Sequence, residues 1–115
     1  MKFCQEHGQQ KSVVAMLPSE KHLNIIAALF KALGDPSRMA LLFALKDGER
    51  CVGDLVDDRN KLSTVSARLK VLFDANLVVR RRDARHLYYR LADQHVVELI
   101  ENALAHADEE MKASV

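Results

Sequence analysis

The stretch "LSTVSARLKVLFDANLVVRRRDARHLYYRL", residues 62 to 91, changes its pattern once along its length. Its first half places Val65, Leu69 and Leu72 at helical spacing, which predicts a helix with one apolar face. Its second half has β-branched and aromatic residues on both sides of a polar turn near Asp83-Ala84, which predicts a β-hairpin. Residues 62–91 are therefore predicted to form a helix followed directly by a hairpin, and the other elements are predicted to pack around this pair.

The segments around this stretch have helical patterns. A short helix at about residues 52–57 is followed by the polar turn "DDRN", so it forms a helix-turn-helix outline with the helix that begins at Leu62. Capping residues predict three more helices, which begin after Ser19, Asp35 and Asp93. We therefore predict a mostly α protein with a two-stranded hairpin, in which the hairpin is the wing of a winged helix-turn-helix.

Length and composition favour one compact domain. The chain has 115 residues, of which 49% are hydrophobic, and this is enough for a single core. We expect an arm at residues 1–18, a DNA-binding and dimerisation domain at residues 19–111, and a tail at residues 112–115. No long apolar run and no leader pattern occur, so we expect a soluble cytoplasmic protein without a membrane partner. Two cysteines that lie far apart also fit a reducing compartment.

The formal net charge of +1 hides a strong segregation. Residues 61–90 carry eight basic side chains against two acidic ones, whereas residues 91–115 carry six acidic side chains against one lysine. The electrostatic field at a surface depends on such local clusters, so a nearly neutral total does not argue against a polyanionic partner. The middle third of the chain is the candidate nucleic-acid-binding face.

Polar and basic side chains in the middle third of the chain are of the types that bind DNA bases and phosphates. Hydroxyl groups on the helix that begins at Leu62 can exchange hydrogen bonds with base edges, and arginines there and on the wing can bind guanine or phosphate. The candidate DNA-binding residues are Ser63, Thr64, Ser66, Arg68, Lys70, Arg81, Arg82 and Arg85.

At this point the chain resembles the ArsR/SmtB family of dimeric winged-helix repressors that sense metals. The resemblance rests on "LGDPSRMALLFAL", "ERCVGDL", "LSTVSARLKVL" and "NLVVRRRDARHLYYRL". Two positions depart from the family pattern. Lys61 stands where a capping serine is usual, so we expect Asn60 or Ser63 to cap the helix, and Ala84 replaces the glycine of the hairpin turn, where a positive φ would be strained.

The last helix carries a candidate metal site that a single chain cannot close. His95 and His106 are eleven residues apart, so they face the same way but lie roughly 16 Å apart along the axis. Two antiparallel copies bring Asp93 and His95 of one helix against His106 and Glu109 of the other, a set that suits Zn²⁺ and accepts Co²⁺. An apolar stripe on the same helix fits this pairing: Val96, Leu99, Ile100, Ala103, Leu104 and Ala107.

The resemblance implies the same four residues as the family's zinc site. It also implies the direction of regulation, in which a metal-free homodimer binds operator DNA and a divalent metal, Zn²⁺ first, releases it. A second candidate site combines Cys51 and Asp54, expected on one side of the short helix, with Cys4 and His7 of the arm. This set suits Zn²⁺ or the softer Cd²⁺, Pb²⁺ and Cu⁺.

Two alternatives remain open at this stage, a repressor that senses thiol oxidation and a winged-helix repressor that answers to another inducer. A repressor that senses thiol oxidation would form a disulfide between Cys4 and Cys51, and it would respond to peroxide instead of metal. An enzyme is not expected, because a four-ligand metal site leaves no open position for an activated water and no nucleophile with a positioned base occurs.

Overall fold

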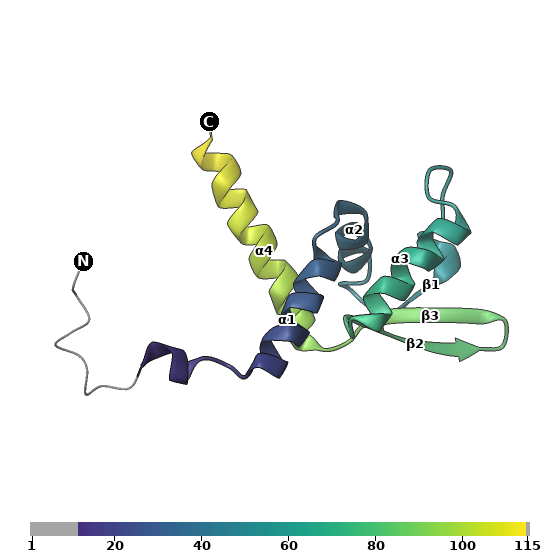
Figure 1. Ribbon diagram of the computed structural model, residues 1–115. Coiled ribbons are helices and arrows are strands. Elements are labelled where there is room, and N and C mark those ends of the chain that lie inside the picture. Colours follow the sequence, from purple (N-terminus) through teal and green to yellow (C-terminus); the bar gives the residue numbers. More distant parts are fainter. Residues whose placement is uncertain (1–11, 115) are drawn as a thin grey trace.

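The structure is a computed structural model that describes residues 12–114 of the chain. The elements are, in chain order, η2 (Val13–Met16), α1 (Glu20–Leu33), α2 (Pro36–Ala44), β1 (Arg50–Cys51), η3 (Val52–Leu55), α3 (Leu62–Asp74), β2 (Val78–Asp83), β3 (His86–Leu91) and α4 (Gln94–Ala113). The predicted order of helices and hairpin is confirmed. Figure 1 shows the hairpin at one end of the molecule, with α2 and α3 beside the sheet and α4 leading away from this body.

Side-chain caps start three of the helices. Ser19, Asp35 and Asp93 each accept a hydrogen bond from the backbone N–H three residues later, at 3.1, 3.0 and 3.1 Å. Each cap satisfies one of the N–H groups that a helix start leaves without a partner. The three predicted caps are confirmed, although α4 continues to Ala113, two residues beyond the expected end at Met111.

The start of α3 differs from the prediction. Lys61 occupies the cap position and makes no side-chain capping bond, so the expectation that Asn60 or Ser63 caps this helix was wrong. The turn before α3 is instead organised by Asp57, whose carboxylate accepts from the N–H groups of Arg59 and Asn60 at 2.9 and 2.7 Å. The hydrogen bonds from Asn60 and then Arg59 lower the pKa of Asp57 below its ordinary value.

The first helix of the predicted helix-turn-helix is a single turn. It is the 3-10 helix η3, which ends at Leu55 instead of Asp57, and Cys51 precedes it in strand β1. The connection from η3 to α3 nevertheless keeps the helix-turn-helix order.

The predicted hairpin is confirmed, and a third strand joins it. β2 and β3 pair antiparallel from Val78 opposite Leu91 to Asp83 opposite His86, and the short β1 pairs with the other edge of β3, giving the order β1-β3-β2. The turn between β2 and β3 contains Ala84 at φ 55°. This is the left-handed conformation that was expected to strain an alanine.

One face of α3 is the centre of the core. Val65, Leu69 and Leu72 are 0% exposed, as their spacing predicted. They belong to a single cluster of buried side chains contributed by all four helices and the sheet. Its largest members that are completely enclosed are Leu42, Leu45, Leu69, Leu72, Leu77 and Ile100, followed by Val65 and Val78. The recognition helix and the wing are therefore held by one core.

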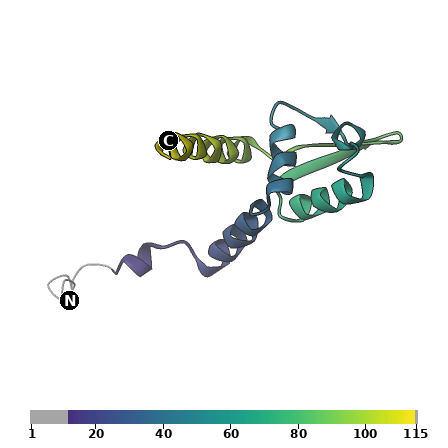
Figure 2. The ribbon, with the colours of Figure 1, turned by 90° about the horizontal axis from the view of Figure 1, so that it is seen from above.

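Helices α1 and α4 project from this body on the side opposite the wing tip (Figure 2). Both keep apolar side chains uncovered in the single chain, with Leu23, Ile26 and Phe30 exposed on α1 and Leu104 exposed on α4. Only Val96 and Ile100, near the start of α4, are buried. The outer half of α4 therefore makes no contribution to the core of its own chain.

Replacing Ala84 by glycine should stabilise the protein. An alanine in the left-handed region costs about 1–2 kcal/mol, and part of the gain on Ala84→Gly is offset by the greater freedom of glycine in the unfolded chain. We expect the free energy of unfolding to rise by about 0.5–1 kcal/mol in urea titrations at matched protein concentration. Ala67→Gly on the exposed face of α3, the matched control, should lower it by about 1 kcal/mol. A free energy unchanged by Ala84→Gly would show that the turn holds alanine without strain.

Candidate nucleic-acid interface and metal ligands

The outer face of α3 presents small polar groups and one lysine. Ser63, Thr64, Ser66 and Lys70 are exposed, because the buried residues of α3 turn the opposite face outward. Lys70 lies 2.8 Å from the carboxylate of Asp74 one turn later, an exposed pair that leaves the lysine side chain 72% accessible. Side chains of this size allow a helix to approach the floor of a DNA major groove.

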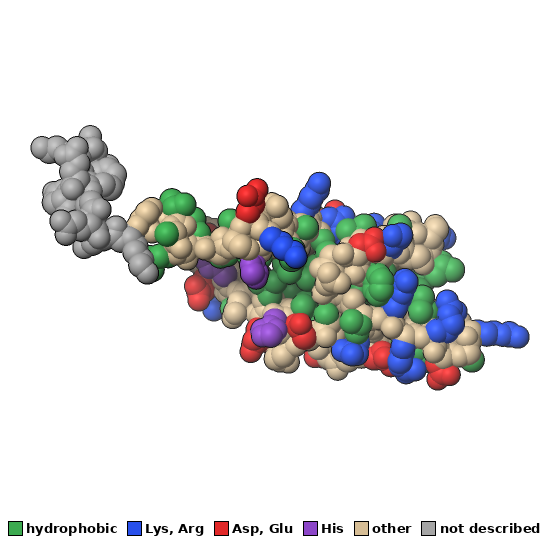
Figure 3. Space-filling view, turned by 60° about the horizontal axis from the view of Figure 1, so that its bottom comes forward, with side chains coloured by type: hydrophobic (Ala, Val, Ile, Leu, Met, Phe, Trp, Pro, Cys, Tyr) green, Lys and Arg blue, Asp and Glu red, His purple; other side chains and the backbone are tan. Residues whose placement is uncertain are grey.

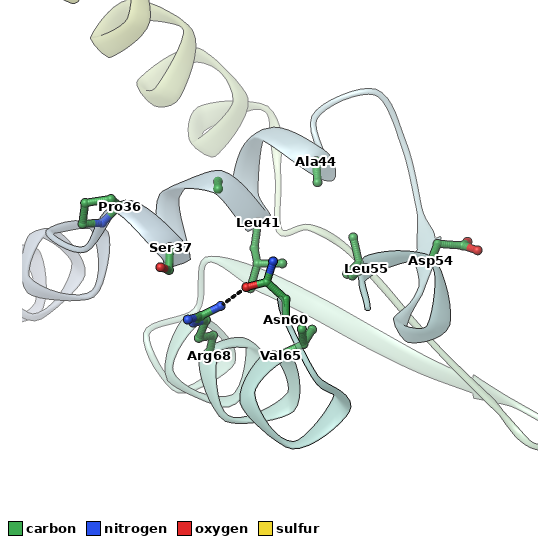
Figure 4. Close-up of a pocket in the computed structure, with 10 residues that line it drawn as sticks. Pro36, Ser37, Leu41, Ala44, Asp54, Leu55, Asn60, Val65 and Arg68 are labelled. Atoms are coloured by element: carbon green, nitrogen blue, oxygen red, sulfur yellow. Dashed lines mark hydrogen bonds between the residues drawn. The ribbon is translucent and has the colours of Figure 1, made fainter. Parts of the chain in front are cut away.

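Arg68 lies on a different side of α3. Its guanidinium donates to the side-chain oxygen of Asn60 at 2.8 Å, and both residues line a cavity of about 440 Å³ between α2, η3 and α3. Figure 4 shows this bond and the inward position of Val65, whereas the carboxylate of Asp54 points away from the cavity. Unlike the hydroxyl groups of α3, Arg68 is half-buried and already engaged within the protein.

The wing arginines fall into two groups. Arg82 on β2 and Arg85 in the turn are exposed near the tip of the hairpin. Arg80 and Arg81, in contrast, rest on aromatic rings, with Arg80 4.0 Å from the ring centre of Phe73 and Arg81 4.5 Å from that of Tyr88. Such cation–π contacts fix the position of a guanidinium group. Only the first group is free to reach beyond the wing.

Arg81 is also held by an ion pair. Its ε and η N–H groups donate to the two carboxylate oxygens of Glu49 at 2.9 and 2.7 Å. The hydrogen bond raises the pKa of Arg81, and the same bond lowers the pKa of Glu49 below its ordinary value. Both shifts favour the charged forms of the pair.

Lys and Arg side chains gather over the wing end of the molecule in Figure 3, with some acidic side chains among them, while the visible histidine side chains lie toward the end that carries α1 and α4. The charge segregation found in the sequence is therefore also a segregation in space. A polyanion meets positive charge at one end, and the candidate metal ligands of α4 lie at the other.

The candidate ligands of α4 form two separate groups. Asp93 Oδ1 lies 3.7 Å from His95 Nδ1 at the start of the helix, and His95 is 93% exposed. Three turns later, His106 Nε2 lies 4.0 Å from the carboxylate of Glu110, and the neighbouring Glu109 is exposed. Across residues 12–114, no group of three or more His, Cys, Asp or Glu side chains is arranged to hold a metal ion. A single chain therefore offers two half-sites.

Cys51, in the second candidate set, has a neighbour that the sequence patterns did not indicate. Its sulfur lies 3.6 Å from His86 Nδ1, at the start of β3. Asp54 follows on η3, one 3-10 turn after Cys51. Cys4 and His7 fall outside the described residues, so the structure leaves the rest of this set untested.

Two residues of interest, Glu49 and His86, were missed by pattern analysis. The contacts of both residues depend on the pairing of β1 with β3, which places Cys51 opposite Tyr88. Alternation is the signal that could have indicated them, because Glu49, directly before β1, is expected on the same side as Cys51, and His86 and Tyr88 share one face of β3. A strand of two residues is too short for that alternation to be recognised in advance.

No helix in the described part of the chain combines the length and apolar character needed to cross a bilayer.

Comparisons with known proteins agree with this geometry. The sequence profile described as "Bacterial regulatory protein, arsR family" matches residues 35–79. The HTH-type transcriptional repressor SmtB of Mycobacterium tuberculosis is 37% identical over 94 residues, which are 81% of this chain and 70% of that protein. The transcriptional repressor SmtB homolog of Synechocystis is 42% identical over 85 residues, which are 73% of this chain and 64% of that protein.

A solved structure shares the fold. The homodimeric winged helix-turn-helix DNA-binding domain of a possible ArsR-family regulator from Mycobacterium bovis superposes with a TM-score of 0.73 at 33% identity, covering 81% of this chain and 90% of that domain. The predicted winged helix is thereby confirmed. The chain belongs to the ArsR family of bacterial regulatory proteins, which are DNA-binding transcription regulators and not enzymes.

Proposed function

We propose that this chain is a metal-responsive repressor that binds operator DNA as a metal-free homodimer and leaves it when a divalent metal, Zn²⁺ first, binds. The observation that carries the proposal is the separation of the candidate ligands of α4 into two exposed groups, on a helix whose residues 101–114 are all exposed in the described part of the chain. A relative named as a transcriptional repressor, SmtB, and one named as a cadmium resistance transcriptional regulatory protein support it.

The uncovered apolar surface supports the dimer. Exposed residues of α1 and α4 flank a pocket lined by Phe30, Leu33, Gly34, Met39, Leu99, Ile100 and Ala103. Contiguous apolar surface of this kind marks an interaction site, and the Mycobacterium bovis domain that resembles this chain is homodimeric. We propose that residues 19–111 form the DNA-binding and dimerisation domain, between the arm 1–18 and the tail 112–115, with α1 and α4 of two copies packed together.

The donor chemistry of the half-sites fits zinc. Asp93 and His95 of one copy with His106 and Glu109 of the other provide two imidazole nitrogens and two carboxylates, and all four side chains are exposed and able to turn toward a partner. A bound Zn²⁺ supplies a four-coordinate link between the two copies. The same set accepts Co²⁺.

A short path joins this site to the wing. Asp93 caps α4 through the N–H of Val96, and the residue before it, Ala92, donates its N–H to the carbonyl of Leu77 at 3.0 Å. Leu77 directly precedes β2, the first strand of the wing. The start of α4 is thus joined to both strands of the hairpin, by the chain itself through Ala92 to β3 and by this hydrogen bond to the residue before β2, and we propose this connection as the physical route of regulation.

For the DNA interface, we propose that Ser63, Thr64 and Ser66 approach base edges and that Lys70, Arg82 and Arg85 neutralise phosphates. All six side chains are exposed on α3 or the wing tip. Arg68 and Arg81, which are bonded to Asn60 and Glu49, belong to the interface as supports of these elements.

A softer metal bound through Cys51 is the second candidate. The 3.6 Å contact between Cys51 and His86 favours it, because a sulfur and an imidazole nitrogen already lie together beside the wing. With Asp54 and with Cys4 and His7 of the arm, this set suits Zn²⁺, Cd²⁺, Pb²⁺ or Cu⁺. Oxidation of Cys4 and Cys51 to a disulfide would use the same thiols.

Loss of one proposed ligand should abolish the zinc response without abolishing DNA binding. In a gel-shift titration, we expect zinc to weaken operator binding of the native chain by about 5- to 150-fold, the usual range of allosteric coupling. His106→Gln and Glu109→Gln should bind metal-free DNA normally and show no release. Glu110→Gln, the adjacent carboxylate on the same helix, is the matched control and should respond as the native chain does. If zinc left the affinity of the native chain unchanged, the zinc-sensor proposal would be wrong.

A charge in the proposed dimer seam should separate the copies. Leu104 is 46% exposed in the single chain, so Leu104→Lys is expected to leave the domain folded while burying an unpaired ammonium in the dimer. Analytical ultracentrifugation should show a shift from dimer to monomer at micromolar concentration, with an unchanged helical circular dichroism spectrum. Val71→Lys, at an exposed position of α3, should remain dimeric. A dimeric Leu104→Lys protein would place the interface elsewhere.

Cys51→Ser distinguishes the two metal sites. We expect zinc-induced release to persist in this variant, while the ultraviolet charge-transfer band of a thiolate–Cd²⁺ bond disappears. Loss of zinc-induced release would move the regulatory site to Cys51. Release of DNA from the native chain by hydrogen peroxide, absent in Cys4→Ser, would instead identify the protein as a thiol redox sensor.

A further inference from the structure

On the outer face of the sheet, the side chains of Glu49, Arg81 and Tyr88 form a set of contacts across all three strands, which we call the brace. Glu49 lies directly before β1 at one edge, Arg81 lies in β2 at the other edge, and Tyr88 of β3 stands opposite Arg81 between them. β1 pairs with β3 and not with β2, so the Glu49–Arg81 pair at 2.7 and 2.9 Å is a direct link between the two outer strands. The Arg81 guanidinium covers the Tyr88 ring at 4.5 Å.

The brace also determines which wing charges reach solvent. Besides Glu49, the carboxylate of Asp83 lies 3.8 Å from Arg81, so two acidic groups face this one cation. Within residues 12–114, Arg82 and Arg85 take part in no ion pair, although both are exposed. Arg90, on the same face as Glu49, adds to the positive field around that carboxylate.

We infer that Glu49 is a positioning residue for DNA binding, which acts by holding the wing to strand β1 through Arg81, and that Arg81 therefore does not contact a phosphate. A planar guanidinium bonded to both oxygens of one carboxylate and stacked on a ring has a defined orientation, which a lysine at the wing tip would lack. This inference rests on the proposed function, since it concerns how the wing meets DNA.

If Arg81 contacted a phosphate instead, one variant would change DNA affinity in the opposite direction. If Arg81 exchanged Glu49 for a phosphate in the complex, Glu49→Gln would release the arginine and strengthen DNA binding. If Glu49 and Arg81 form a brace, removing either partner loosens the same hairpin, so both single variants weaken binding and the double variant is no weaker than either one. Non-additivity of this kind marks residues that act as a unit.

The experiment measures the salt dependence of binding to a fluorescently labelled duplex of mixed sequence by anisotropy. For Glu49→Gln, Arg81→Gln and the double variant, we expect affinity at fixed salt to fall by about two- to fivefold, the factor that corresponds to an exposed ion pair. The slope of log affinity against log salt should stay that of the native chain. Arg82→Gln, one residue along the same strand, is the matched control and should lower the slope by about 0.9, because it removes a phosphate contact.

Two results overturn the inference. One is a Glu49→Gln protein that binds DNA more tightly, with a slope steeper by about 0.9, together with an Arg81→Gln protein whose slope is shallower by the same amount. The other result would come from amide hydrogen exchange measured without DNA. If the inference holds, both single variants exchange faster over residues 81–88 than the native chain does. Unchanged exchange in that hairpin would show that no brace exists.

The exchange measurement needs no DNA, so it separates this inference from the proposed function. A native chain that failed to bind any duplex would contradict the proposed function, while faster hairpin exchange in Glu49→Gln would still establish the brace.

Discussion

Complete burial of one face of α3 determines how the polar face of this helix and the wing are oriented for contact with DNA. Val65, Leu69 and Leu72 are enclosed by side chains from α2 and from the start of β2, so the hydroxyl groups on the other side of the helix must face outward. The helix ends at Asp74, Asn76 follows in the left-handed conformation, and the chain passes directly through Leu77 into β2. The recognition helix and the wing therefore move as one body, and their spacing is set by core packing instead of by a flexible linker.

A second constraint acts on the other end of the molecule. Within the described part of the chain, residues 101–114 of α4 are all exposed, and an exposed helix of this length with an apolar stripe is not expected to remain alone in water. The helix carries the candidate metal donors near its two ends, too far apart to share an ion. An antiparallel copy of the same helix would both bury the apolar stripe and bring the two groups of candidate metal ligands together. Assembly and metal binding are for this reason parts of a single proposal.

Much of the fold could be predicted because its signals are local. Helical spacing identified the buried face of α3, short polar residues identified three caps, and the change to β-branched and aromatic residues identified the hairpin. The errors arose where a side chain had several partners to choose from. Asn60 was expected to cap α3, but it bonds with Asp57 and Arg68 instead.

The candidate sites were less predictable, because counting charges does not show which charges are already paired. Arg68 and Arg81 were read as free cations, yet each has a partner that only the folded chain brings near, 8 and 32 residues away along the sequence. The contact between Cys51 and His86 spans 35 residues and depends on the register of a two-residue strand. Local patterns carry no information on register between distant segments.

Asp93 illustrates how closely the first turn of α4 is tied to its chemistry. One oxygen of its carboxylate both caps the helix and faces His95, so the folded helix already fixes the rotamer from which this residue, as a proposed ligand, would approach an ion. Little torsional freedom remains to be lost when an ion arrives. Conversely, an unravelled first turn would set the carboxylate free to rotate, so fraying of this helix and dissociation of a ligand would be a single kinetic event, and the rate of one would limit the rate of the other.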